Sequence, residues 1–274
     1  MMDIGVKLAS MRFETDLEEV LGRAQLAGVG QFVAIGVDLD SSVRSGLLVR
    51  RHPGKIYATA GVHPHRASAL RLSDMPLFRE LWADAAVVAV GETGLDYHRM
   101  LSPATTQRAV FEWQLEEALV AAKPVFLHCR DAHEEFLSSI SAFCKMGGRG
   151  LVHCFTGGAR ELEDYLALGL DIGVSGWVCD LERGRALREA LPLVPSGRLH
   201  LETDAPFLPP AGRAGLTRRS RNEPAYLVHV AQEVASLRGE CPAVLAARCA
   251  MNSRLFFDIP EPSLMTPADP EIFR

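Results

Sequence analysis

The sequence lacks any uninterrupted run of about twenty apolar residues, the length that a membrane-spanning helix requires. It also lacks the apolar stretch of a secretory signal peptide, because charges such as Asp3, Lys7 and Arg23 are spread through the N-terminal region. We therefore expect a cytoplasmic protein that does not bind a membrane. Nothing in the sequence predicts an obligate protein partner.

Closely spaced cysteines and an excess of positive charge are also missing. The six cysteines are scattered without a CxxC pair, which is typical of free thiols in a reducing compartment and not of a disulfide framework. The formal net charge is −5, so a polyanionic substrate would have to be held by a local basic patch.

What the sequence does contain is a regular alternation of short apolar runs and helical periodicity. Stretches such as 17–28 and 109–122 place apolar side chains three or four positions apart, with Leu26 and Ala122 on the expected buried faces. Further helices are expected at about 134–145, 160–168, 183–191 and 225–237. The strand-like runs are 3–8, 32–36, 56–62, 87–91, 124–128, 150–154, 170–175 and 199–203.

Strand and helix alternating in this way predict an α/β fold with a parallel sheet and helices outside it. For 274 residues, 48% of them hydrophobic, the arrangement that closes most naturally is a (β/α)8 TIM barrel, and a doubly wound open sheet is the alternative. We predict one barrel domain at 1–258. The proline-rich segment 259–274 is expected to be an irregular tail.

Residues able to bind a metal ion stand at the carboxyl ends of the predicted strands. Glu92 follows the run 87–91, His128 and His153 end their runs, Asp204 follows 199–203, and His63 follows 56–62. Because the carboxyl ends of barrel strands share one mouth, we expect Glu92, His128, His153 and Asp204 to meet around a divalent cation. Two imidazoles with one or two carboxylates suit Mg²⁺, Mn²⁺ or Zn²⁺, with Mg²⁺ our first choice.

Two cysteines directly follow the candidate histidines. Side chains in a strand alternate between its two faces, so Cys129 and Cys154 are expected to pack away from His128 and His153. No Ser-His-Asp or Cys-His motif stands in a recognisable setting, which argues against a covalent mechanism.

At these residues the sequence resembles the TatD family of metal-dependent deoxyribonucleases, among the amidohydrolase-like barrels. The resemblance extends through nearly the whole chain up to about residue 258. It rests on AGVHPH (60–65), VGETGLDYHR (90–99), PVFLHCRDAHEEF (124–136), LVHCFTG (151–157), GVSGWVCDLERG (173–184), LHLETDAPFL (199–208) and RRSRNEPAYL (218–227).

The resemblance implies divalent-metal-dependent hydrolysis of phosphodiester bonds in DNA. It further implies 3′-5′ exonuclease action on single-stranded DNA, with RNA as a further candidate substrate. In the family, the residues that match Glu92, His128, His153 and Asp204 surround the metal centre.

The first strand departs from the usual family pattern, Asp-x-His-x-His. The matching stretch is DIGVK (3–7), so Gly5 and Lys7 occupy the histidine positions. A glycine has no side chain to ligate a metal, and a protonated lysine repels a cation. We therefore expect one well-formed metal site, held by Glu92, His128 and His153. Lys7 either places positive charge near the attacked phosphate or is a structural partner of Asp204.

The remaining candidate residues are expected to activate the attacking water, contact phosphate groups or stack on nucleobases. Asp204 is expected to accept the proton of the attacking water. His63 contacts the phosphate, protonates the leaving oxygen, or only fixes the loop after the third strand. Arginines in the expected mouth loops are candidate phosphate ligands, foremost Arg130, Arg219 and Arg221. Trp177 and Phe207 either stack on unpaired bases or plug the top of the barrel.

Two other functions remain open. One is a metal-dependent ester or amide hydrolase, for example a deacylase that releases a D-amino acid from mischarged tRNA. Amidases of this architecture place a carboxylated lysine where this chain has Glu92, and that position favours the nuclease. The other is a barrel that binds nucleic acid without catalysis, although four converging polar groups would be costly to keep without a metal.

Overall fold

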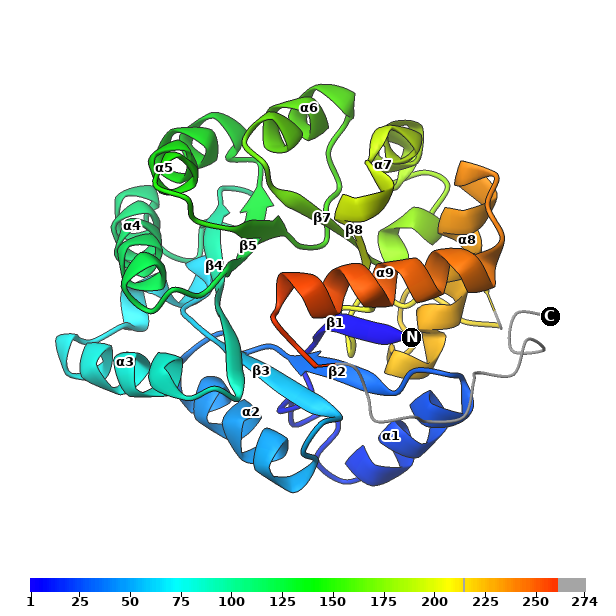
Figure 1. Ribbon diagram of the computed structural model, residues 1–274, viewed down its shortest axis with the longest axis horizontal. Helices are drawn as coiled ribbons and strands as arrows, with labels where there is room; N and C mark the ends of the chain where they lie inside the picture. The colour runs from blue at the N-terminus through cyan, green and yellow to red at the C-terminus, as the bar shows by residue number, and fades with distance from the viewer. Residues whose placement is uncertain (214, 261–274) are drawn as a thin grey trace. The chain divides into compact units, whose positions relative to one another are not determined.

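The computed structural model describes residues 1–213 and 215–260, and Figure 1 follows the chain through its elements. The predicted irregular tail lies outside the described residues from position 261 onward. The strands are β1 (Met2–Val6), β2 (Gln31–Ala34), β3 (Ile56–Ala60), β4 (Val87–Asp96), β5 (Val125–Arg130), β6 (Gly150–Val152), β7 (Asp171–Val174) and β8 (Leu199–Leu201).

Helices follow most of the strands. The α-helices are α1 (Leu17–Leu26), α2 (Leu39–Arg51), α3 (Met75–Ala83), α4 (Ala104–Val120), α5 (His133–Lys145), α6 (Ala159–Ala167), α7 (Arg185–Ala190), α8 (Leu227–Arg238) and α9 (Pro242–Phe256). Short 3₁₀ turns are η1 (Pro64–Ala69), η2 (Leu72–Asp74), η3 (Gly176–Cys179), η4 (Leu191–Leu193), η5 (Ser196–Arg198) and η6 (Pro224–Tyr226). None of the described helices is long and apolar enough to cross a membrane.

The strand order follows the sequence without reversal. All eight strands belong to one sheet in the order β1 to β8, and Val6 at the end of β1 also forms a parallel bridge with Ala205 beyond β8. The pairs β3–β4, β4–β5, β5–β6 and β7–β8 run parallel. A doubly wound sheet would reverse its order at a switch point. The predicted (β/α)8 topology is therefore confirmed.

Within the described residues the chain has two compact units. The first consists of 1–33, 154–162 and the residues from 172 onward, and the second of 34–153 and 163–171. In the second unit, helices α2 to α5 lie outside β3 to β5 (Figure 1). The boundary of a single barrel domain at residue 258 stays a prediction.

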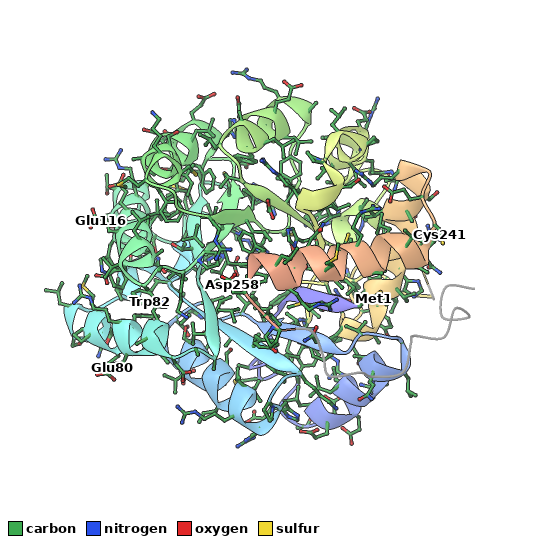
Figure 2. All side chains as sticks on the ribbon, in the orientation of Figure 1. Met1, Glu80, Trp82, Glu116, Cys241 and Asp258 are labelled. Carbon is green, nitrogen blue, oxygen red and sulfur yellow. The ribbon has the colours of Figure 1, made fainter. Side chains whose placement is uncertain are left out.

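The second unit is held by aromatic packing between helices and strands. Trp82 of α3, labelled in Figure 2, is buried, stacks on Phe78 with ring centroids 5.5 Å apart, and donates from Nε1 to the carbonyl of Ala60 at 2.7 Å. Phe111 of α4 stacks on Phe136 of α5 at 5.4 Å. Pairs of this kind combine apolar burial with about 0.5–1.5 kcal/mol from ring geometry.

A buried glutamine of α4 links the segment after β3 to the interior of β4. The Gln114 side-chain amide donates to the carbonyl of Val62 at 3.0 Å and to the Thr93 hydroxyl at 2.6 Å, while its oxygen accepts from the Val62 N–H at 2.7 Å. Val62 immediately precedes His63, and Thr93 immediately follows Glu92. One helix side chain therefore holds the residue next to each of these two candidate residues.

The main difference from the sequence-based expectation concerns β4. The apolar run stops at Gly91, whereas the strand continues to Asp96 because Gly94 and Asp96 still pair with His128 and Arg130 of β5. Glu92 consequently lies inside a strand, at a register shift between Gly91 and Thr93. The shift occurs where the sheet turns from apolar to polar side chains.

Two residues that the sequence predicts on buried helix faces, Leu26 and Ala122, do not lie there. Leu26 is 83% exposed. It stands six positions after the buried Val20, which at about 100° per residue turns it away from the buried face. Ala122 lies beyond the end of α4 with a φ of 52°. Helix α2 went unrecognised because its buried face includes Ser42 and Ser45, which weaken the apolar periodicity.

Replacing the buried glutamine should destabilise the protein measurably. Gln114→Leu leaves the Val62 backbone groups and the Thr93 hydroxyl without their partner, so the free energy of unfolding should fall by about 2–3 kcal/mol. Urea denaturation followed by circular dichroism measures the change. Glu116→Gln, on the exposed side of the same helix, is the control and should stay close to wild type. Equal stability of the two variants would refute a fixing role for Gln114.

Candidate metal centre

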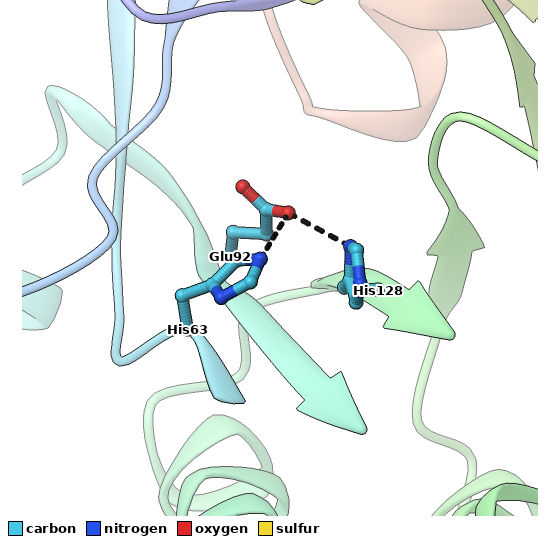
Figure 3. A group of neighbouring side chains, drawn as sticks. All are labelled: His63, Glu92 and His128. Carbon is cyan, nitrogen blue, oxygen red and sulfur yellow. Dashed lines mark ion pairs between the residues drawn. The ribbon is translucent and has the colours of Figure 1, made fainter. Parts of the chain in front are cut away.

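The centre of the candidate site is one carboxylate oxygen that faces three imidazole rings. Glu92 Oε1 lies 3.1 Å from His63 Nε2, 3.1 Å from His128 Nδ1 and 2.8 Å from His153 Nε2. Figure 3 shows His63 and His128 directed at the Glu92 carboxylate. Glu92 is only 1% exposed. The second compact unit therefore brings together Glu92, His128 and His153, as predicted, and adds His63 to them.

Each of these side chains lies in, or shortly after, a different strand. Glu92 lies in β4, His128 in β5, and His153 follows β6, while His63 follows β3. These strands are neighbours in a parallel sheet, and their carboxyl ends meet at the same edge. The pairing of Gly94 with His128 sets how far β4 and β5 are shifted along one another.

The donor set fits a divalent cation. One ligand atom from each of His63, Glu92 and His128 lies within 4.8 Å of the others, which is close enough for a shared ion. Imidazole nitrogen with carboxylate oxygen suits borderline to hard divalent ions. A carboxylate buried among imidazoles is costly unless positive charge compensates it.

His128 has the arrangement typical of a metal-binding histidine. Its Nδ1 faces Glu92, while its Nε2 lies 3.1 Å from Asp96 Oδ2. A carboxylate on the second ring nitrogen fixes the tautomer and leaves the first nitrogen free to bind the metal. The same Asp96 oxygen lies 2.8 Å from His65 Nε2, and Asp96 Oδ1 accepts from the Arg99 N–H at 2.8 Å.

Asp96 is a functional candidate that the sequence analysis missed. It belongs to the VGETGLDYHR stretch, yet the predicted strand ended at Gly91 and left it in a loop. The usable signal was chemical, because a metal-binding histidine commonly has a carboxylate partner. Burial alone would raise the pKa of Asp96, but hydrogen bonds from His128, Arg99 and His65 hold it well below its usual range.

The hydrogen bonds of His63 identify its tautomer. The backbone N–H of His65 donates to His63 Nδ1 at 3.0 Å, so the proton of the neutral ring is on Nε2, which faces Glu92. Burial lowers the pKa of His63 to about 4, so the ring is neutral at neutral pH. A protonated Nε2 donates a hydrogen bond and cannot ligate a metal, so in this tautomer His63 is the member of the group His63, Glu92 and His128 that does not serve as a ligand.

The pKa of His128 is shifted the other way. Burial alone would lower the pKa, but the hydrogen bonds to Asp96 and Glu92 raise it above the usual value. Two histidines beside the same carboxylate are thus differentiated by their second partner, a backbone N–H for His63 and a carboxylate for His128.

The first compact unit contains Lys7 and Asp204, which form a close ion pair. Lys7 Nζ lies 2.7 Å from Asp204 Oδ1, and both side chains are largely buried. The backbones are joined as well, since the Asp204 N–H donates to the Gly5 carbonyl and the Lys7 N–H to the Ala205 carbonyl, each at 2.8 Å. This pairing is compatible with both predicted roles of Lys7, namely positive charge near the attacked phosphate and a structural partner for Asp204.

Gly5 is accounted for by its neighbour Glu202. A Cβ at position 5 would lie 2.0 Å from Glu202 Oε2, so no larger residue fits while that carboxylate stays in place. Glu202 is fully buried, and its Oε1 accepts from the backbone N–H of Cys154, the residue after His153. The carboxylate of Glu202 therefore occupies the space that the side chain of a first-strand histidine would need.

The cysteine beside His153 contacts a serine hydroxyl. The Cys154 sulfur lies 3.0 Å from the Ser175 hydroxyl. Burial, followed by the charges of Asp204 and Glu202, raises the pKa of Cys154 well above that of an ordinary thiol. A neutral thiol is a poor ligand and nucleophile. All six cysteines, which fall within the described residues, are free thiols.

Arg221 and its neighbour Arg218 in the first unit already have acidic partners. Arg221 contacts Asp16 at 2.6 and 2.8 Å and Glu223 at 2.7 Å, which argues against its predicted role as a phosphate ligand. Arg218 is bonded to Asp180. Arg219 is exposed and has no ion pair within the described residues.

The pKa of Asp180 reflects these arginine contacts. Burial would raise it, but hydrogen bonds from Arg183 and Arg218 lower it to about 2. Asp180 therefore stays ionised at neutral pH and stabilises the loop that Arg218 contacts.

Removing the carboxylate partner of His128 should weaken metal binding without unfolding the protein. Asp96→Asn removes the charge that fixes the His128 ring, so affinity for Mn²⁺ should fall by about 10- to 100-fold. Isothermal titration calorimetry measures the change. Asp131→Asn is a matched control, because Asp131 lies 2.9 Å from the exposed His98 in the same kind of pair. If both variants bind Mn²⁺ as wild type does, Asp96 has no part in the metal site.

Comparison with known proteins agrees with this geometry. The family model described as TatD related DNase matches residues 2–258. A protein of Erwinia billingiae named 3′-5′ ssDNA/RNA exonuclease TatD is 45% identical over 260 residues, which cover 95% of this chain and all of that protein.

Solved structures agree as well. YjjV, a TatD homologue from Escherichia coli, superposes with a TM-score of 0.82 at 28% identity, covering 95% of this chain and 98% of its own. A TatD family hydrolase from Entamoeba histolytica gives a TM-score of 0.83 at 25% identity, covering 93% and 97%. The match over nearly the full length, together with the cluster around Glu92, shows that the chain belongs to the TatD family of metal-dependent DNases.

Proposed function

We propose that the protein is a divalent-metal-dependent exonuclease that removes nucleotides from the 3′ end of single-stranded DNA or RNA. The observation that carries the proposal is the buried Glu92 carboxylate facing three imidazole nitrogens. The relatives at 42–45% identity, named 3′-5′ ssDNA/RNA exonuclease TatD, support this substrate class and polarity.

Glu92, His128 and His153 would hold the cation, with Mg²⁺ as the proposed ion. When bound, such an ion lowers the pKa of a coordinated water and polarises the phosphate. Glu92 supplies the negative charge of the site, and Asp96 holds the His128 ring so that Nδ1 faces Glu92. His153 supplies the second imidazole.

For His63 we propose a hydrogen bond to a phosphate oxygen. Its Nε2 carries the proton of a neutral ring, as the His65 N–H on Nδ1 requires. A neutral imidazole is too weak an acid to protonate a leaving alkoxide, so of the two predicted catalytic roles we propose donation to a phosphate oxygen. That proton faces Glu92 in this structure, so the proposed role requires the Nε2–H to exchange Glu92 for the phosphate oxygen when substrate binds.

Asp204 is proposed as the group that accepts the proton of the attacking water. Its ion pair with Lys7 orients the carboxylate. Lys7 thus acts on the reaction through Asp204, which is a positioning role. Hydrolysis breaks the P–O3′ bond and releases a nucleotide 5′-phosphate, and the leaving 3′ oxygen takes a proton from solvent to become the new 3′ hydroxyl of the shortened strand.

Arg130 and Arg219 are proposed as phosphate ligands. Arg219 is exposed on the loop between β8 and α8, and Arg130 is half-buried at the end of β5, two residues beyond His128. Phosphate contacts of this type increase affinity without selecting a sequence.

The direct test is digestion of a 5′-labelled single-stranded oligonucleotide with Mg²⁺. Wild type should produce a ladder that shortens from the 3′ end, and EDTA should abolish it. His128→Ala should lower the rate by at least about 100-fold, because a metal ligand is lost. His98→Ala, an exposed histidine, is the matched control and should keep the wild-type rate. Full-length oligonucleotide after prolonged incubation with wild type would overturn the proposal, as would equal rates for the two variants.

The role of Lys7 can be tested separately. Lys7→Met removes the ion pair with Asp204, and kcat should fall by about 10- to 100-fold while KM changes little, because the effect acts on the base and not on substrate affinity. Lys7→Arg should restore part of the rate. Steady-state kinetics and thermal unfolding are both needed. Unchanged turnover at wild-type stability would leave Lys7 with a purely structural role.

A further inference from the structure

An exposed aromatic residue follows Asp204 on the loop after β8. Phe207 is 46% exposed, although Ala205 and Pro206 before it are buried. Single exposed apolar side chains are common on protein surfaces and indicate nothing by themselves. Phe207 differs from them in the charges beside its ring and in the rigidity of its loop.

Two cations lie over the ring, both farther from it than the 4.3 Å that separates the Arg183 guanidinium from the Trp177 ring. Lys7 Nζ lies 5.5 Å and the Arg12 guanidinium carbon 5.9 Å from the ring centroid. Lys7 is neutralised by Asp204, but Arg12 is exposed and has no ion pair within the described part of the chain. The Arg12 guanidinium donates from Nη1 to the Pro206 carbonyl at 3.4 Å, which keeps it next to the loop.

The loop that carries Phe207 is held in place by a buried asparagine. The Asn222 amide donates to the carbonyls of Thr203 at 2.8 Å, Phe207 at 2.6 Å and Leu208 at 3.1 Å. The Phe207 N–H itself donates to the Asp204 carbonyl at 2.9 Å. The ring is thus presented on a fixed backbone, so little conformational entropy is lost when it contacts a ligand.

The other aromatic candidate is in a different situation. The Arg183 guanidinium lies 4.3 Å from the Trp177 ring centroid, and its Nε is bonded to Asp180 at 2.7 Å. An ion-paired side chain of the protein thus already lies over the Trp177 ring. Of the two aromatic residues proposed from the sequence, only Phe207 combines an exposed ring with a cation that has no acidic partner.

We propose that Phe207 and Arg12 form a nucleotide subsite of this protein. The phenyl ring stacks on an unpaired base of a single-stranded nucleic acid, and the Arg12 guanidinium contacts a neighbouring phosphate. The subsite rests on the proposed nuclease function for its substrate class. Because every base has a π face, it tolerates any sequence, and because these two contacts do not involve the 2′ hydroxyl, it accepts DNA and RNA alike.

Binding of labelled oligonucleotides tests the subsite without turnover. Fluorescence anisotropy compares oligo-dT with a strand of abasic tetrahydrofuran units of equal length, in EDTA and again with Ca²⁺. Wild type should bind oligo-dT about 5- to 150-fold more tightly than the abasic strand, the range for one stacked base. Phe207→Leu, which keeps an apolar side chain without a π face, should lose this preference and bind the abasic strand as wild type does.

Arg12 is tested by salt dependence. Arg12→Gln should weaken binding of both strands and reduce the slope of log affinity against log salt by about 0.7, the contribution of one phosphate contact to a single strand. Arg185→Gln, an exposed arginine on α7, should leave the slope unchanged. Leu181→Ala removes a side chain that is 72% exposed and should not alter the preference for oligo-dT. Thermal unfolding of each variant verifies that it is folded.

Several outcomes would overturn the subsite. These are equal wild-type affinity for the two strands, an intact preference in Phe207→Leu, loss of the preference in Trp177→Leu alone, or an unchanged salt slope in Arg12→Gln. A wild-type protein that binds with this dependence on Phe207 but releases no nucleotide would support the subsite and overturn the proposed exonuclease. The two proposals therefore fail separately.

Discussion

The buried carboxylate of Glu92 is the constraint on which the second compact unit depends. Taking an ionised carboxylate out of water costs several kcal/mol unless hydrogen bonds or positive charge compensate it. Three imidazole nitrogens at 2.8–3.1 Å surround one of its oxygens. Asp96 on His128 and the His65 N–H on His63 then decide which nitrogen each ring presents. A chain of buried polar contacts reaching back to Gln114 of α4 keeps the strand ends in place.

In the first compact unit the departure from the usual family pattern is compensated by side chains nearby. Gly5 leaves space that the Glu202 carboxylate fills, and Lys7 forms an ion pair with Asp204. Neither position can contribute a ligand as a histidine would. The absence of two imidazoles on β1 is therefore accompanied by two local contacts. The Glu202 carboxylate accepts a hydrogen bond from the Cys154 backbone, and the Asp204 carboxylate is paired with Lys7.

Residues of the same type have different surroundings in this structure. Arg221 is bound by two carboxylates, whereas Arg12 and Arg219 have no ion pair within the described residues. Trp177 lies under Arg183, whereas Phe207 is exposed on a loop held by Asn222. Charged and aromatic residues are candidates for nucleic-acid binding, but contacts with distant segments determine which of these side chains are free to bind a ligand.

Sequence periodicity and motif were sufficient for the (β/α)8 topology and for the grouping of Glu92, His128 and His153, because parallel strands must bring their carboxyl ends to one edge. They could not place Asp96, since the extension of β4 is set by pairing with β5 and not by apolar character. The tautomer of His63 depends on a backbone N–H two residues away, and the exclusion of a side chain at Gly5 depends on Glu202, far along the chain. The local sequence pattern determines where helices and strands form. Contacts between distant residues determine which nitrogen of a histidine is protonated, how much space a side chain has and whether it is exposed, and only the tertiary structure contains these contacts.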